Sequence, residues 1–133
     1  MTLPIAERWF EHQRIDAAIT RLWEPHVVPL MRCNIWHVRG RDRDLVIDTG
    51  MGIASLVAAM QQLLDKPVTA VATHGHGDHI GGHHEFDDCI AHALEAPLLQ
   101  NPRLASLEHR TAFGSDGIAR LARAGYDMSE PSW

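Results

Sequence analysis

Nine consecutive residues, His74 to Gly82, place the tightest constraint on how this chain can fold. They contain three histidines, one aspartate and four glycines in the order H-x-H-x-D-H-x-G-G, directly after the β-branched segment 68–73, which we predict to be a strand. Glycine lets the backbone turn sharply where the strand ends, and alternation then brings His74 and His76 to the same side. The fold must therefore present a tight polar loop at one edge of a sheet.

The four polar side chains of this loop predict a metal site. Asp78 can begin a helix, which places its carboxylate and the His79 ring near the positive end of that helix. This field favours ionised carboxylate and neutral imidazole, the forms that bind a divalent metal. A solvated turn would explain the glycines but not three imidazoles, so we predict His74, His76, Asp78 and His79 as metal ligands. Zinc is the default at neutral pH, and iron and manganese accept the same donors.

The residues before the loop predict a strand, a helix and a second strand. Segment 45–47 is apolar and ends at D-T-G, after which apolar residues recur at helical spacing over 53–64. A helix there makes a right-handed crossover between strands 45–47 and 68–73, so these two strands should be parallel in one sheet. A further strand is predicted at 89–91. The fold class is therefore α/β.

The rest of the chain gives weaker signals. Loose alternation over 15–23 predicts a strand or a strand pair, and 32–38 predicts a strand covered on both faces. The charged run 39–44 predicts a solvated hairpin loop between antiparallel neighbours. Helices are predicted beyond the last strand, at 93–100, 103–109 and 118–124.

Charge and apolar content exclude several classes of protein. The 133 residues carry 12 Lys+Arg and 17 Asp+Glu, a formal net charge of -5, without the basic stripe that nucleic acid requires. The longest nearly apolar stretch, 51–60, is about half as long as a membrane span. Glu7 and Arg8 interrupt the apolar core that a secretory signal would need, and two cysteines make no disulfide framework. We therefore expect a cytoplasmic protein with no nucleic-acid partner and no membrane partner.

The segment T-H-G-H-G-D-H-I-G-G, preceded by L-V-I-D-T-G and a helix, resembles the signature of the metallo-β-lactamase fold hydrolases. The resemblance covers residues 33–92 and implies a four-layer αββα sandwich with two zinc ions at the edge of its sheets. It assigns His74 and His76 to the first metal and Asp78 and His79 to the second. Asp48, at the end of its strand, would support the metal loop without binding metal directly.

The same resemblance implies a hydrolase that acts on a small molecule. A water activated by the metals would attack the carbonyl of an ester, thioester, lactone or lactam, with Asp78 as the catalytic residue that orients the water. Segment 24–36 resembles a branch of the family associated with acyl-thioester hydrolysis, which favours a thioester. Two alternatives stay open, an iron-dependent oxidoreductase of sulfur substrates on the same fold and a non-catalytic metal-binding fragment.

The sequence departs from the family pattern in two ways. Gly75 and Gly77 stand where relatives carry bulkier residues, so we expect a loosely packed loop. No G-H-[ST]-x-G segment follows His79, so we expect residues 1–133 to be the N-terminal part of one domain whose C-terminal half is absent. An exposed sheet face would then favour self-association. His83 could replace a missing ligand, although a place on the helix surface is the favoured interpretation.

Overall fold

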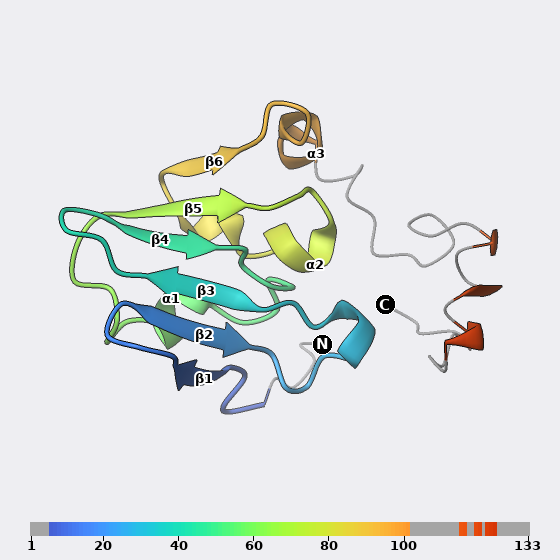
Figure 1. Ribbon diagram of the computed structural model, residues 1–133, viewed down its shortest axis with the longest axis horizontal. Coiled ribbons are helices and arrows are strands. Elements are labelled where there is room, and N and C mark those ends of the chain that lie inside the picture. The colour runs from blue at the N-terminus through green and yellow to red at the C-terminus, as the bar shows by residue number, and fades with distance from the viewer. Residues whose placement is uncertain (1–5, 102–114, 117–118, 121, 125–133) are drawn as a thin grey trace, which may run out of the picture.

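The computed structural model describes residues 6–101, 115–116, 119–120 and 122–124. Its described part is built on one six-stranded sheet with the strands in chain order, β1 to β6 (Figure 1). The strands are β1 Glu11–Arg14, β2 Ile19–Trp23, β3 Ile35–Val38, β4 Asp44–Ile47, β5 Val68–Ala72 and β6 Cys89–Ala91. The helices are α1 Leu56–Ala59, α2 Gly77–Ile80 and α3 Ala96–Gln100, with short 3-10 helices η1 Pro29–Met31 and η2 His83–Glu85.

The sheet changes from antiparallel to parallel at β4. Strands β1 to β4 pair antiparallel, whereas β4, β5 and β6 pair parallel. The register sets Ile47 opposite Val71, so β4 and β5 end at the same edge. The predicted crossover and the α/β class are therefore confirmed, and the residues after both strands meet at that edge.

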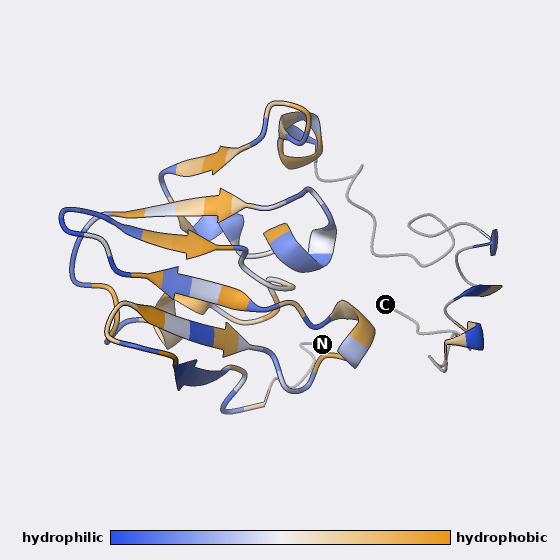
Figure 2. Ribbon diagram, viewed as in Figure 1, coloured by the Kyte–Doolittle hydropathy of each residue, from blue (hydrophilic) through white to orange (hydrophobic). Residues whose placement is uncertain are grey.

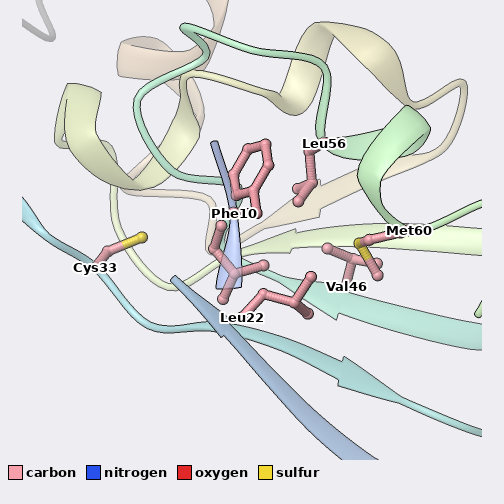
Figure 3. Close-up of a cluster of buried hydrophobic side chains, with 7 residues drawn as sticks. Phe10, Leu22, Cys33, Val46, Leu56 and Met60 are labelled. Carbon is pink, nitrogen blue, oxygen red and sulfur yellow. The ribbon is translucent and has the colours of Figure 1, made fainter. Parts of the chain in front are cut away.

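One face of the sheet carries the core. Leu22, Ile35 and Val46 from three strands are at most 2% exposed and pack with Leu56 of α1 and the neighbouring Met60. Figure 3 shows these side chains between the sheet and the α1 region, and Figure 1 shows α1 behind the strands as drawn. Hydrophobic colour prevails on β4, β5 and β6, while the edge strand β1 is polar (Figure 2). Burial of these apolar side chains stabilises the packing of α1 on the sheet.

The helix predicted over 53–64 is shorter in the structure. Only Leu56–Ala59 is α-helical, and residues 60–63 continue as turns that keep Met60 buried. Ser55 caps the helix through its hydroxyl, which accepts a hydrogen bond from the Ala58 amide at 3.1 Å. The periodicity identified Leu56 and Met60 as buried, but Ile53 is 43% exposed, and the spacing did not identify where the regular hydrogen bonds stop.

The N-terminal strand predictions are also adjusted. Segment 15–23 contains one strand, β2, which begins at Ile19, and Ile15 lies half-exposed in the turn before it. The preceding strand β1 was not predicted. Residues 32–34 precede β3 and are not part of it. The helix predicted at 93–100 is α3, shortened to Ala96–Gln100, whereas the helices at 103–109 and 118–124 fall wholly or partly outside the described residues.

The charged loop 39–44 is only partly solvated, which corrects the sequence-based prediction. Asp44, its last residue, is fully buried and accepts a hydrogen bond from His37 Nε2 at 2.8 Å and another from the Gly40 amide at 3.0 Å. Burial raises the pKa of the Asp44 carboxyl, but these hydrogen bonds and the charges of His37 and Lys66 outweigh it, so its pKa lies below the ordinary value. This pair closes the hairpin at the edge opposite the metal loop.

The second face of the sheet is half-buried among the described residues. Trp36, Ile47 and Val71 lie in one cross-strand row on that face, and Ile90 extends the row to the edge strand with 52% of its surface exposed. In the described ranges, no helix combines the length and the apolar character needed to cross a membrane.

Candidate metal centre

Asp48 is the residue around which the candidate site is built. It follows β4 directly and adopts a left-handed backbone conformation with φ of 59°, which asparagine and aspartate tolerate better than most residues. Its carboxylate accepts hydrogen bonds from the Thr73 amide at 2.8 Å and the Thr73 hydroxyl at 2.7 Å. The carboxylate thereby fixes the end of β5 next to the end of β4.

The same carboxylate orients the His79 ring. His79 Nδ1 lies 2.7 Å from Asp48 Oδ2, and because an ionised carboxylate only accepts, Nδ1 carries the proton and donates it. In the neutral ring, the lone pair of the other nitrogen, Nε2, can then bind a metal. A histidine held through one nitrogen by a carboxylate is the usual outer-shell arrangement in protein metal sites.

Burial and hydrogen bonding set the charges of this pair. Burial raises the pKa of Asp48, but the hydrogen bonds from His79 and Thr73 outweigh it, so the pKa lies below its ordinary value. Burial lowers the pKa of His79, but the Asp48 hydrogen bond and the charges of Asp78 and Asp48 outweigh it, so the pKa is raised. In the metal-free chain, therefore, the two carboxylates have more influence on the His79 ring than the field of the short helix α2.

His74 and Asp78 lie beside His79, and His76 lies beside His74. The ring centroid of His74 lies 4.1 Å from that of His79 and 4.7 Å from that of His76, and Asp78 Oδ2 lies 3.5 Å from His79 Nε2. Asp78 is in the first turn of α2, as predicted, and is buried, while His76 is the residue before the helix. Burial and the neighbouring rings of His79 and His76 lower the pKa of His74, which favours its neutral form.

The chemistry of the four side chains fits a divalent cation. In the structure, however, these side chains lie farther apart than the ligands of a bound ion would. Imidazole nitrogens and a carboxylate oxygen are the donors that zinc, iron and manganese accept. Within the described ranges, no three His, Cys, Asp or Glu side chains are close enough together to hold an ion between them. The His79 Nε2 atom, freed by Asp48, is the observation that most directly favours metal binding.

Thr49 and His83 contact each other beside the metal loop, a contact that the sequence interpretation did not predict. The Thr49 hydroxyl lies 2.7 Å from His83 Nδ1 and accepts a hydrogen bond from the Gly82 amide at 3.0 Å. His83 is 7% exposed, so its predicted place on a helix surface is wrong, and burial lowers its pKa. It serves to join the D-T-G turn to the segment after α2. The i, i+4 spacing from His79 gave no signal for this contact.

Glu24 supports the D-T-G turn from the N-terminal side. Its carboxylate is fully buried and accepts hydrogen bonds from Trp9 Nε1 at 2.9 Å and from the Met51 amide at 3.0 Å. Burial, with the nearby charge of Asp78, raises the pKa of Glu24 despite these two hydrogen bonds. A Cβ at Gly50, where φ is 74°, would lie 2.5 Å from Glu24 Oε2, so glycine is required there.

Gly75 is closely packed, which corrects the expectation of a loose loop at that position. A Cβ there would lie 2.5 Å from Leu98 Cβ and 2.6 Å from Leu98 Cδ1. The first of these atoms is anchored to the α3 backbone and cannot move alone. The glycine is therefore a steric requirement of the contact between the metal loop and α3.

The family model of the Metallo-beta-lactamase superfamily matches residues 28–114 of the chain. The chain belongs to the metallo-beta-lactamase superfamily, as its HxHxDH motif predicted. This family is characterised by divalent metal ions, which agrees with the donor set at the ends of β4 and β5.

Similar proteins include the acyl-coenzyme A thioesterases MBLAC2. The protein from Gallus gallus is 39% identical over 103 residues, and the one from Homo sapiens is 37% identical over 106 residues. Each alignment covers 71% of this chain but only 37% and 38% of the two relatives. The chain thus spans well under half the length of the curated relatives that it matches.

Solved structures confirm the fold. The metallo beta lactamase from Hirschia baltica superimposes with a TM-score of 0.56 at 21% identity, covering 72% of this chain and 49% of that one. A metallo beta lactamase from Erythrobacter litoralis gives 0.54 at 23% identity, covering 72% and 47%. The metallo-β-lactamase-like fold predicted from the sequence is therefore correct, and the chain matches about half of each structure.

Proposed function

We propose that this chain carries the metal-binding half of a hydrolase active site that acts on small acyl substrates. The observation that supports this most directly is the Asp48–His79 pair, which orients His79 Nε2 beside the His74 ring and the Asp78 carboxylate. A divalent cation, with zinc as the favoured ion and two ions in a complete site, would lower the pKa of a water and polarise a carbonyl. The donors and their support come from this chain.

Each residue has a distinct part in this proposal. His74, His76 and His79 would hold the cations through ring nitrogens. Asp78, buried in the first turn of α2, would bind a cation and orient the attacking water. Asp48 would keep His79 in the tautomer that donates through Nε2, which is why it supports the centre without touching the metal.

A thioester is the favoured substrate because the similar curated proteins are named acyl-coenzyme A thioesterases. Thioester, ester, lactone and lactam carbonyls all react by the same attack of water, so the metal loop alone does not choose among them. The choice would depend on the groups that bind the rest of the substrate. An acyl-coenzyme A panel with chains of different length, together with a lactam and a lactone, tests it directly.

The experiment is a zinc titration of the chain and of His74→Ala, followed by hydrolysis assays on the zinc-loaded protein. We expect zinc binding by the native chain, at least tenfold weaker binding by His74→Ala, and unchanged binding by the control His12→Ala, whose ring is exposed on β1. Equal zinc binding by all three proteins would contradict the metal centre. Zinc binding without hydrolysis would favour the non-catalytic alternative, and iron with oxygen uptake would favour the oxidoreductase.

A further inference from the structure

The short segment from Glu95 through α3 packs against the metal loop at Gly75. The Gly75 amide donates a hydrogen bond to Glu95 Oε2 at 2.7 Å, and Leu98 fills the space where a Gly75 side chain would be. Both Glu95 and Leu98 are partly buried. The two contacts come from residues 20 and more positions away in the chain, so neither belongs to the loop's own turn.

Gly75 is the residue between His74 and His76, so whatever fixes its backbone also fixes both neighbours. The peptide that joins His74 to Gly75 is planar, and the direction of its N–H sets the plane of the whole unit. Glycine has no side chain to restrict its dihedral angles and would otherwise sample many conformations. The Glu95 carboxylate selects the one conformation in which this N–H points at it.

Leu98 restricts the same residue sterically. Leu98 occupies the space that a Gly75 side chain would need, so it limits movement of the loop toward α3. The hydrogen bond and the packing contact therefore act on one residue from one short element. Burial of the contact also strengthens the hydrogen bond relative to one exposed to water.

We propose that Glu95 is a positioning residue for the metal centre, which holds Gly75 so that the His74 and His76 rings are presented together, with Leu98 as its steric counterpart. This inference rests on the metal-binding role proposed above. It assigns to the β6–α3 junction a part in metal affinity that the HxHxDH motif does not include. Glu95 acts through Gly75 and is not itself a ligand.

Zinc affinity, measured by competition with a chromophoric chelator, tests the proposal. We expect Glu95→Ala to weaken zinc binding about tenfold to a hundredfold, the usual effect of removing an outer-shell partner. Glu95→Gln should restore most of the affinity because its amide oxygen still accepts the Gly75 N–H. A Glu95→Ala protein that binds zinc as tightly as the native chain would overturn the proposal.

Glu85 provides the matched control. Its carboxylate accepts hydrogen bonds from the amides of Leu56 and Val57 and caps α1, away from Gly75. Glu85→Ala should lower the unfolding midpoint without a comparable loss of zinc affinity. If Glu85→Ala and Glu95→Ala lose zinc affinity in proportion to their lost stability, Glu95 is merely structural and the proposal fails.

A measurement on the metal-free chain separates this inference from the proposed function. In NMR spectra, Glu95→Ala should speed hydrogen exchange of the Gly75 amide and shift the ring resonances of His74 and His76, while Glu85→Ala should leave all three in place. A native chain that binds no zinc would contradict the proposed function, yet these spectra would still decide whether Glu95 positions the two rings. Unchanged spectra in Glu95→Ala would overturn the positioning role.

A double-mutant cycle tests whether Leu98 restricts the metal loop at Gly75. Gly75→Ala should weaken zinc binding because the new methyl group displaces Leu98, and adding Leu98→Ala should recover part of that loss by making room for it. Losses that simply add, without recovery, would show that Leu98 does not act on the loop through Gly75.

Discussion

Two carboxylate–histidine pairs lie at opposite ends of β4, and they make nearly the same hydrogen bond in different surroundings. Asp44 and His37 are joined at 2.8 Å with side chains 0% and 1% exposed. Asp48 and His79 are joined at 2.7 Å with side chains 6% and 23% exposed. The bond length alone therefore says nothing about which pair has a chemical role.

The two pairs differ in how far they are enclosed and in what surrounds the histidine ring. His37 is enclosed in the core face of the sheet, where its ring stabilises the hairpin end. His79 keeps Nε2 directed toward Asp78 and has the His74 ring 4.1 Å away. A carboxylate that is enclosed with its partner stabilises the fold, whereas one that leaves the partner's other nitrogen open can prepare a ligand.

Breaking the Asp44–His37 pair should have the largest effect on stability. Asp44→Ala removes the acceptor of His37 and of the Gly40 amide inside the protein, and we expect it to lower the free energy of unfolding by about 3 kcal/mol or more. Urea denaturation monitored by circular dichroism measures this loss. The control Asp42→Ala changes a 72% exposed aspartate in the same loop. A loss below about 1 kcal/mol for Asp44→Ala would contradict the comparison.

Breaking the Asp48–His79 pair should affect metal binding more than stability. Asp48→Asn leaves His79 without its carboxylate, so we expect zinc affinity to fall about tenfold to a hundredfold. Chelator competition measures the affinity, and Asp65→Asn, at a 61% exposed surface aspartate, is the control for the chemical change. Equal zinc affinities in Asp48→Asn and the native chain would remove the distinction between the two pairs.

The pH dependence of the metal-free chain should sharpen the contrast. The pKa of His79 is raised on folding, so its contribution to stability is fully present below about pH 6.5, the unfolded pKa, and is lost as pH rises through the folded pKa. His79→Gln should lack this alkaline loss. The difference between the urea midpoints of the two proteins, followed from pH 5.5 to 9, isolates the contribution. A difference that does not change with pH would count against the raised pKa.

On the acid side the two pairs should behave alike. The pKa values of Asp44 and Asp48 both lie below the ordinary value, so their stabilising contributions are present above about pH 3.9 and are lost as pH falls through the folded pKa values. Acid unfolding curves of Asp44→Asn and Asp48→Asn should therefore both be flatter than that of the native chain. A flatter curve for only one of them would show that the other carboxylate titrates as in the unfolded chain.

An exposed ion pair provides the smallest expected effect. Arg39 and Asp65 are joined at 2.6 Å, but their side chains are 37% and 61% exposed, so solvent screens the attraction. Arg39→Ala should change the free energy of unfolding by about 0.5 kcal/mol or less. The same urea experiment measures this change. A loss comparable to that of Asp44→Ala would show that burial does not determine how much each pair contributes to the free energy of unfolding.

The sequence was sufficient for the parts of the fold that depend on local pattern. Period and composition identified the strands that became β3 to β6 and the parallel crossover through α1, because apolar spacing reports which face is buried. Helix ends were less accurate: α1 stops at Ala59 although the apolar spacing continues to Leu64. Regular hydrogen bonding depends on what packs nearby, and spacing does not contain that information.

The residues of the candidate site also fall into two groups, those that the sequence identified and those that it did not. His74, His76, Asp78 and His79 are adjacent in the sequence and were recognisable as a group, and their metal-binding role stays a prediction. Thr49, Glu24 and Glu95 were missed because each contacts the site through the folding of distant segments. His83 was considered as a ligand, but its buried contact with Thr49 was not predicted. A buried polar residue without a local motif gives no signal in a single sequence.

Self-association also stays a prediction. The row of Trp36, Ile47 and Val71 is half-buried, and Ile90 extends it with 52% of its surface exposed. Such a face favours pairing with a second copy of the chain. Sedimentation velocity across a concentration series should show a dimer that Trp36→Lys weakens. A monomer at all concentrations would contradict this expectation.

The long reach of the Asp48 and Thr49 contacts also determines when the centre can form. Asp48 bonds to groups 25 and 31 residues later, and Thr49 to one 34 residues later. Closing loops of that length costs chain entropy that local contacts do not repay, so such contacts form late in folding. While the residues after Thr73 are still inside the ribosome, the D-T-G turn has already been synthesised. It cannot yet form its contacts with His79 and His83. Assembly of the centre must wait for synthesis and docking of the histidine loop.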